Sequence, residues 1–150
     1  MKILVTGATG FLGKYVIDEL LAHDYFIVAF GRNEKIGKAL EGERVQFIKG
    51  DLSAIEELRQ AFQSVDAVVH AGALSTAWGP WKAFYQANVV GTQNVLDLCR
   101  EYAVKRLVYV SSPSIYAAGK DQLNIKESDA PKENHPLLKK YYYTIIHYST

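Results

Sequence analysis

Short apolar runs alternate with helically spaced apolar residues along the first 110 residues of this chain. The runs are rich in β-branched residues, a composition typical of buried strands, and they occupy residues 2–5, 25–30, 44–49, 67–71 and 106–110. Helices are predicted from near residue 10, at 36–40, after 53 and from about 80 to 102. Because helices separate continuously apolar strands, the pattern indicates a parallel sheet that is covered on both faces.

Two of the predicted helices carry local start signals. Ser53 and Glu56 have the spacing of a capping box, in which the hydroxyl and the carboxylate each bind a free N–H of the first turn. Pro80 is a residue favoured at the first helical position, so the long helix is expected to begin near it.

The element order predicts the fold class and the edge where a ligand binds. Right-handed crossovers between parallel strands give a doubly wound, Rossmann-type α/β sheet, and ligands of such sheets bind beyond the carboxyl ends of the strands. The residues expected at that edge are Gly7, Arg32, Asp51, 70–73 and Ser112. We expect the sheet to be incomplete on its C-terminal side, because apolar surface would otherwise stay uncovered after residue 110.

Composition fits one domain and argues against several partners. The chain has 150 residues, 49% of them hydrophobic, which is enough for one packed core. Its net charge of +1 gives no reason to expect a nucleic acid or an anionic membrane as partner. No apolar run approaches the roughly 20 residues of a membrane span, no leader pattern is seen, and Cys99 lies in a helical apolar pattern. We therefore expect a cytoplasmic protein with Cys99 in its core.

The glycine-rich turn between the first strand and the first helix is suited to holding a phosphate. Gly7, Gly10 and Gly13 follow the run at 2–5 and precede the helical pattern. Unpaired N–H groups at a helix start point toward an anion, and the helix dipole adds partial positive charge there. Glycine also permits unusual backbone angles and lets a ligand approach the backbone closely.

Five segments together resemble a known family. They are Thr6-Gly7-Ala8-Thr9-Gly10-Phe11-Leu12-Gly13, Gly50-Asp51-Leu52, His70-Ala71-Gly72-Ala73, Asn88-Val89-Val90-Gly91-Thr92 and Val110-Ser111-Ser112-Pro113-Ser114-Ile115-Tyr116. The first differs from the G-x-G-x-x-G dinucleotide fingerprint by one extra residue between its first two glycines. In these segments the chain resembles the extended short-chain dehydrogenase/reductases, the NAD(P)-dependent epimerase/dehydratase family. The run 78–88 resembles the hydroxysteroid-dehydrogenase-like branch.

The resemblance implies a role for each matched position. Coenzyme-binding roles fall on Gly7, Thr9, Gly10, Phe11, Leu12, Gly13, Asp51, Leu52, Ala71, Gly72, Ala73 and Asn88. The first glycines, with residues 11 and 12, would surround the diphosphate, 51 and 52 would lie along the adenine, and 71–73 would pass beneath the ribose and nicotinamide. Ser112 would donate to the oxygen of the substrate.

Structural roles compete with several of these assignments. Asp51 could cap a turn, Asn88 could be a structural hydrogen-bonder in its helix, and Ser112 could be a turn residue before a proline. We interpret His70 as a core histidine, because no metal-like cluster surrounds it. The aromatic residues Trp78, Trp81, Phe84 and Tyr85 are expected to pack, with the two tryptophans as alternative borders of a substrate cleft.

The residue after the second strand bears on the choice of coenzyme. An acidic side chain there would bind the ribose 2′-hydroxyl of NAD, but this chain has Arg32. A guanidinium can hold a 2′-phosphate through two parallel hydrogen bonds, so the sequence favours NADP. If Arg32 instead stacks on the adenine or faces solvent, NAD remains the alternative.

The catalytic tyrosine is harder to identify. The family reaction needs a tyrosine and, four positions later, a lysine whose charge lowers the phenol pKa. Among the last tyrosines, residues 141–143 are followed at that spacing by Ile145, Ile146 and His147, and the partner of Tyr148 would be residue 152. Tyr148 is our candidate beside Ser112, and we expect no complete Tyr-x-x-x-Lys pair in this chain.

These observations predict part of an enzyme. Residues 1–136 are expected to form a partial NAD(P)-binding domain and 137–150 an atypical or truncated tail, with a substrate domain missing. The enzyme would act on a secondary alcohol or carbonyl of a sugar nucleotide or sterol-like small molecule, and the chain alone is expected to be inactive. The alternatives are a non-catalytic dinucleotide-sensing module and, less supported, a structural or RNA-associated domain; a homo-oligomer is left open.

Overall fold

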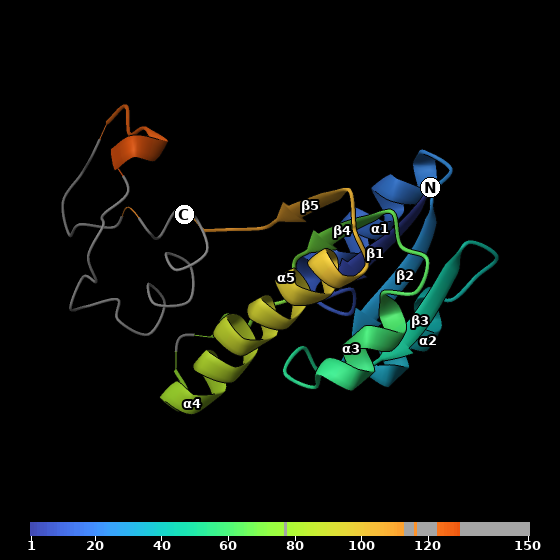
Figure 1. The fold of residues 1–150 in the computed structure, drawn as a ribbon, viewed down its shortest axis with the longest axis horizontal. Helices are drawn as coiled ribbons and strands as arrows, with labels where there is room; N and C mark the ends of the chain where they lie inside the picture. Colours follow the sequence, from blue (N-terminus) through green and yellow to red (C-terminus); the bar gives the residue numbers. More distant parts are fainter. Residues whose placement is uncertain (77, 113–115, 117–122, 130–150) are drawn as a thin grey trace.

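Five parallel strands form the centre of the computed structural model, which describes residues 1–76, 78–112, 116 and 123–129. The strands are β1 (Lys2–Thr6), β2 (Phe26–Gly31), β3 (Val45–Lys49), β4 (Ala67–His70) and β5 (Arg106–Tyr109). Their order in the sheet is β3-β2-β1-β4-β5, so the chain starts in the middle and builds outward in both directions (Figure 1). This confirms the doubly wound, Rossmann-type α/β fold.

Helices connect the strands as the apolar spacing predicted. They are α1 (Phe11–Ala22), α2 (Glu34–Leu40), α3 (Ile55–Ala61), α4 (Trp81–Phe84) and α5 (Gly91–Glu101). A π-helical segment, η1 (Tyr85–Val90), joins α4 to α5, so the predicted long helix runs without a break from residue 81 to 101. A short 3-10 helix, η3, covers Glu127–Asp129.

Alternate residues of the strands build two cores, one on each face of the sheet. Leu4 of β1 belongs to the core that α3 and α5 cover, together with Leu58 and Leu98. Ile3 and Val5 point to the other face, where Ile17 of α1 covers them. Two buried faces explain why the strand runs are continuously apolar rather than alternating.

One local prediction is wrong. The expected capping box of Ser53 and Glu56 does not form, because α3 begins after Ala54 and that cap position has no side-chain hydrogen bond. The backbone N–H and the hydroxyl of Ser53 instead donate to Asp51 Oδ1, at 2.9 and 2.7 Å. A carboxylate two residues earlier is the nearer and charged acceptor, and it takes both donors.

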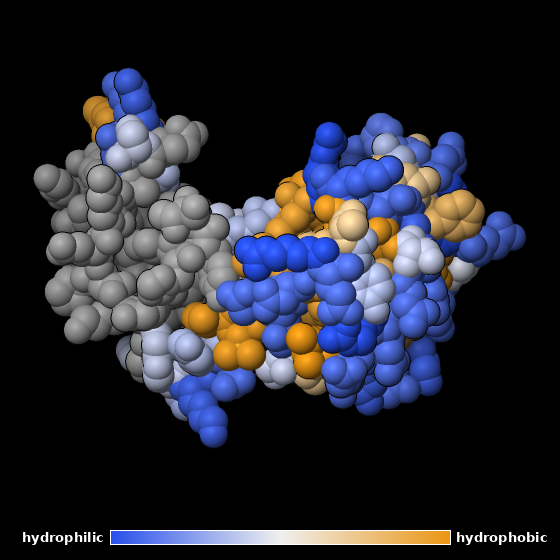
Figure 2. Space-filling view, viewed as in Figure 1, coloured by the Kyte–Doolittle hydropathy of each residue, from blue (hydrophilic) through white to orange (hydrophobic). Residues whose placement is uncertain are grey.

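The surface of the described residues is mostly hydrophilic on the face in Figure 2, and its apolar residues form small separate patches. At the edge strand β5, Val108 is 50% exposed. Cys99 of α5 is half-buried against the core, and burial raises the pKa of its thiol to about 11, as expected for a packing residue. Among the described residues, no helix is long and apolar enough to cross a membrane.

Candidate functional site

A cleft of about 300 Å³ opens beyond the carboxyl ends of β1, β2, β3 and β4. It is lined by Gly7, Thr9, Gly10, Phe30, Gly31, Arg32, Asn33, Gly50, Asp51, Leu52, Ala71, Gly72, Ala73, Leu74 and Ala87. The structure therefore brings the glycine turn, the residue after β2, the segment after β3 and the loop after β4 to one place. The order in which the chain adds strands reverses between β1 and β4, and open α/β sheets bind ligands at such a position.

Gly7 and Gly10 shape the part of the cleft nearest α1. Gly7 has a φ of +71°, and a Cβ built on it would lie 2.7 Å from Gly72 Cα. Gly10 is the N-cap of α1 and donates its N–H to Gly7 O at 2.9 Å. It has no side chain to cap the helix, so the N-cap residue supplies no acceptor for the N–H groups of the first turn. This end of a twelve-residue helix can accept an anion.

Three predicted residues of the same turn lie outside the lining of the cleft. Gly13 packs α1 against the turn, because a Cβ on it would lie 2.4 Å from Gly7 O. The Phe11 side chain is 86% exposed and meets Tyr15 edge to face, and the Leu12 side chain is also exposed. Phe11 and Leu12 can therefore contribute to an anion site only through their backbone N–H groups.

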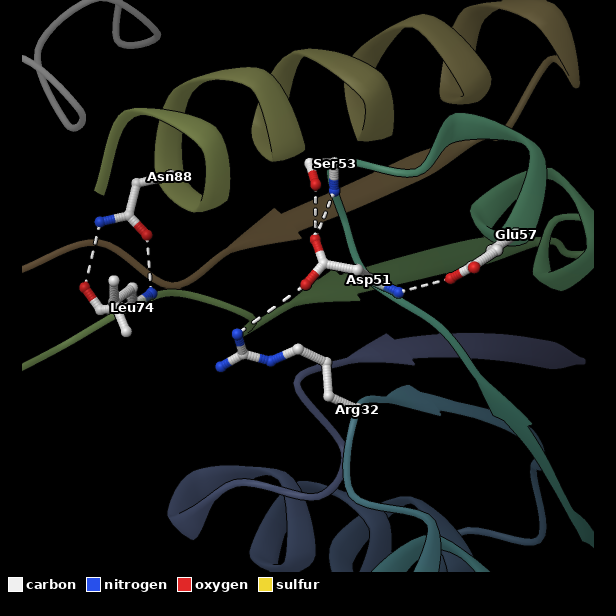
Figure 3. Close-up of polar contacts among 6 residues, drawn as sticks. All are labelled: Arg32, Asp51, Ser53, Glu57, Leu74 and Asn88. Carbon is white, nitrogen blue, oxygen red and sulfur yellow. Dashed lines mark hydrogen bonds and ion pairs between the residues drawn. The ribbon is translucent and has the colours of Figure 1, made fainter. Parts of the chain in front are cut away.

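The two carboxylate oxygens of Asp51 have different surroundings (Figure 3). Its Oδ1 accepts the two hydrogen bonds from Ser53, and its backbone N–H donates to Glu57 Oε2 at 2.9 Å. Its Oδ2 lies 3.8 Å from Arg32 Nη1. Partial burial acts to raise the pKa of Asp51, but the Ser53 hydrogen bonds and the Arg32 charge outweigh it and hold the pKa below its usual value. The side chain is thus an anion that caps a turn with one oxygen and faces Arg32 with the other.

Arg32 follows the last residue of β2, and its side chain is 65% exposed at the rim of the cleft. Its neighbour Asn33 also lines the cleft and caps α2, because Asn33 Oδ1 accepts from Ile36 N at 3.1 Å. The sequence reading missed Asn33 as a cleft residue. An asparagine directly before a predicted helix is the signal that could have found it.

Leu52 is held between two glycines from other segments. A Cβ on Gly72 would lie 2.8 Å from Leu52 Cδ1, and one on Gly91 would lie 2.7 Å from Leu52 Cβ. Asn94 Nδ2 donates to Leu52 O at 2.8 Å. Neither Gly91 nor Asn94 was assigned to the site from the sequence, because their contacts depend on how α5 lies across the loop after β3.

Asn88 lies in the π-helical segment and fastens the loop after β4 (Figure 3). Its Oδ1 accepts from Leu74 N at 2.7 Å, and its Nδ2 donates to Leu74 O at 3.1 Å. Asn88 is buried and is outside the lining of the cleft. These contacts support the structural role that the sequence left open for it.

His70 is a core residue with both ring nitrogens engaged, as interpreted from the sequence. Its Nδ1 lies 2.6 Å from Thr6 Oγ1, and its Nε2 lies 3.0 Å from Thr92 Oγ1. Burial lowers the pKa of the ring to about 4, so it is neutral at physiological pH. Within the part of the chain that the structure describes, no cluster of His, Cys, Asp and Glu could hold a metal ion.

Of the two residues expected to be catalytic, the structure describes one. Ser112 follows β5 and is half-buried, whereas Tyr148 lies outside the described residues. The sequence reading also passed over Tyr116 and Lys120, which have the Tyr-x-x-x-Lys spacing; Lys120 too is outside the described residues. Trp78 was expected to pack but is 90% exposed.

The aromatic residues after Trp78 fit the packing expectation better. Trp81 and Tyr85 are partly exposed and have ring centroids 6.1 Å apart, and Phe84 is buried. A Cβ on Gly79 would lie 3.0 Å from the Phe84 ring, so the absence of a side chain there lets the chain approach it.

Comparison with known proteins gives a family match over nearly the whole chain. The model of the NAD dependent epimerase/dehydratase family matches residues 3–149. Over 115 residues the chain is 43% identical to the 2-alkyl-3-oxoalkanoate reductase of Stenotrophomonas maltophilia (strain K279a), covering 77% of this chain and 34% of that protein. It is 34% identical over 136 residues to the decarboxylating sterol-4-alpha-carboxylate 3-dehydrogenase of Bos taurus, covering 91% and 37%. The chain thus spans about a third of the length of these relatives.

Solved structures of similar fold include complexes with NAD. The UDP-glucose 4-epimerase of Thermus thermophilus, in complex with NAD, is 25% identical and has a TM-score of 0.80, covering 96% of this chain and 48% of that one. MoeE5 in complex with UDP-glucuronic acid and NAD is 29% identical and has a TM-score of 0.80, covering 96% and 46%.

Proposed function

The chain belongs to the NAD dependent epimerase/dehydratase family, and from this premise we propose that its cleft binds the adenosine and diphosphate portion of NADP. The chain would be the coenzyme-binding part of an oxidoreductase. The substrate would carry a secondary alcohol or carbonyl on a sugar nucleotide or a sterol-like small molecule.

The uncapped start of α1 is the observation that carries this proposal. Its first turn faces a cleft lined by Gly7, Gly10 and Gly72, where backbone replaces side chains. A Cβ at Gly7 or Gly72 would meet the neighbouring loop at less than 3 Å, so a side chain there would close the cradle. A diphosphate needs both a close approach to backbone and several N–H donors, and these residues offer both.

Arg32 supports NADP over NAD within this proposal. It stands where an acidic residue would bind the ribose 2′-hydroxyl. The 3.8 Å between Arg32 Nη1 and Asp51 Oδ2 exceeds a hydrogen-bond distance, so the guanidinium keeps its donors available for a phosphate. An exposed ion pair of this length contributes little to stability and is easily exchanged for a stronger one.

The chemistry assigns roles to residues near the end of β5 and beyond. A bound nicotinamide coenzyme would take up or supply a hydride. The Ser112 hydroxyl would donate a hydrogen bond to the substrate oxygen, and Tyr148 would exchange the proton of that oxygen. Tyr116 is the second candidate for the proton exchange, because Lys120 follows it at the spacing that lowers a phenol pKa.

A blocking substitution tests the location of the coenzyme. Ala73 lines the cleft and is exposed, so Ala73→Trp should fill the cleft while the core stays intact. Calorimetric titration with NADPH should show binding to the unmodified chain and at least a tenfold loss of affinity in Ala73→Trp, or about 1.4 kcal/mol. The matched control is Ala22→Trp at the exposed end of α1. Equal affinity in both variants, or no binding of NADPH or NADH to the unmodified chain, would overturn the proposal.

A further inference from the structure

A line of buried polar contacts connects α5 to the loop that lines the cleft. His70 ends β4 and is 1% exposed, and the sheet register sets it beside Thr6 of β1. Its two ring nitrogens contact Thr6 Oγ1 and Thr92 Oγ1 at 2.6 and 3.0 Å. Thr6 Oγ1 also accepts a hydrogen bond from Gly72 N at 3.3 Å. The contacts therefore run from Thr92 through His70 and Thr6 to the backbone of Gly72.

The direction of each hydrogen bond around His70 can be inferred by asking which hydroxyl would lose its acceptor in the opposite arrangement. Within the described residues, the Thr6 hydroxyl has His70 Nδ1 as its acceptor. The Thr92 hydroxyl can use a different acceptor, because a threonine in a helix can donate to the backbone carbonyl one turn earlier. A buried donor that is left unpaired destabilises the fold. The arrangement that satisfies all groups has Thr6 donating to Nδ1, and the hydrogen on Nε2 donated to Thr92.

This arrangement fixes the lone pairs of Thr6. With its hydrogen turned toward His70, the Thr6 oxygen presents a lone pair to the Gly72 N–H. A Cβ on Gly7 would lie 2.7 Å from Gly72 Cα, and a Cβ on Gly72 would lie 2.8 Å from Leu52 Cδ1, so the backbone of Gly72 has little room to shift without opening the cleft. The Tyr109 ring stacks on His70 with centroids 5.5 Å apart and closes the side toward β5.

We propose that His70 is a positioning residue for coenzyme binding: as a neutral ring with its hydrogen on Nε2, it orients the Thr6 hydroxyl and so holds the Gly72 amide at the floor of the cleft. The proposal rests on the proposed function, because the position of Gly72 affects binding only if the coenzyme occupies this cleft. His70 itself touches neither coenzyme nor substrate in this account.

The first test determines which ring nitrogen of His70 carries the hydrogen in the coenzyme-free full chain. Nuclear magnetic resonance of the ¹⁵N-labelled histidine side chains distinguishes the two neutral forms of each imidazole. We expect His70 at pH 7 to carry its hydrogen on Nε2. A hydrogen on Nδ1 would overturn the proposal, because the ring would then donate to Thr6 and leave its hydroxyl undirected.

The second test separates positioning from packing. His70→Asn keeps an acceptor near the place of Nδ1, whereas His70→Gln reaches toward Thr92 and lacks that acceptor. In His70→Gln we expect amide exchange at Gly72 and the Kd for NADPH each to rise about tenfold, the effect of a hydrogen bond of about 1.4 kcal/mol. In His70→Asn both should stay within about twofold of the unmodified chain. Equal losses of affinity in the two variants at equal Tm would show packing alone and overturn the proposal.

A parallel pair covers the case in which His70→Gln does not fold. Thr6→Ser keeps the hydroxyl and should bind NADPH normally, and Thr6→Val removes it and should weaken binding. Equal affinity in these two variants would contradict the proposal. If the unmodified chain fails to bind NADPH, the proposed function fails, while the ring form and the Gly72 exchange still decide the role of His70.

Discussion

Gly7 and Gly72 approach each other because neither has a side chain, and this contact determines the shape of the cleft. We expect Gly7→Ala to lower the free energy of unfolding by about 2 kcal/mol or more, since its φ of +71° is unfavourable for alanine and the new Cβ clashes with Gly72. Urea denaturation measures the change. Gly42→Ala is the control, because a Cβ at Gly42 meets nothing within 4 Å; a similar loss in both variants would refute this explanation.

A substitution of Arg32 tests whether the cleft prefers NADP to NAD. Arg32→Ala should weaken NADPH binding by roughly tenfold to a hundredfold, because a charge-assisted hydrogen bond contributes about 1.5–3 kcal/mol, and should leave NADH binding nearly unchanged. Calorimetry with both coenzymes gives the two affinities. Arg44, which pairs with Asp24 at 2.6 Å before β3, supplies a control arginine outside the cleft. Equal losses for NADPH and NADH would remove Arg32 from phosphate recognition.

His70 gives the protein a pH-dependent stability with a definite sign. The folded ring has a pKa of about 4 instead of the ordinary 6.5, so between these values the unfolded chain binds a proton that the folded protein excludes. Stability should therefore fall as the pH drops from 6.5 to 4, by an amount on the order of 3 kcal/mol. Urea denaturation at several pH values should show this slope in the unmodified chain and a weaker one in His70→Asn. Identical slopes would contradict it.

At the scale of the elements, one continuous helical segment contacts two loops of the site and the end of strand β4. Asn88, Thr92 and Asn94 all lie on the continuous segment from α4 to α5, and they bind Leu74, His70 and Leu52. The π-helical turn contains Asn88 and ends at Val90, and the N–H of its C-cap residue, Gly91, donates to Gln86 O. Such turns re-aim side chains at functional sites, and here the result is that helix and loops form one support for the cleft.

Asn88 allows this support to be tested. Asn88→Ala removes both hydrogen bonds to the backbone of Leu74, so we expect amide exchange at Leu74 to accelerate about tenfold and stability to fall by about 1–3 kcal/mol. Hydrogen exchange measured residue by residue reports both effects. Arg100→Ala, at an exposed position of α5, should change neither. An unchanged Leu74 amide in Asn88→Ala would show that the loop does not depend on this side chain.

The sequence predicted the elements well because both faces of the sheet are buried. Continuous apolar runs identify strands such as β1 and β4 directly, and the helical spacing of Ile17 and its neighbours identifies α1. The capping box failed because local spacing does not reveal that Asp51 competes for Ser53. The contacts of Gly91 and Asn94 with Leu52 were missed for a related reason: they depend on how distant segments pack, which no local pattern records.

At the scale of the molecule, the order of the strands in the sheet determines where the cleft lies. The order β3-β2-β1-β4-β5 separates the connections after β1 and β4 to opposite faces, and the opening between them is where the uncapped helix start points. The cleft is lined by Gly7, Arg32, Asp51 and the loop after β4, all of which were expected at this edge, whereas Ser112, also expected there, is not among its lining residues. Motif order along the chain could predict this grouping because parallel strands end at a common edge.

A structure of the chain with NADPH bound tests the central claim most directly. We expect the coenzyme diphosphate to lie within hydrogen-bond distance of the backbone N–H groups at the start of α1, over Gly7 and Gly10, with the 2′-phosphate beside Arg32. A diphosphate bound elsewhere, or a cleft that stays empty at a saturating coenzyme concentration, would contradict it.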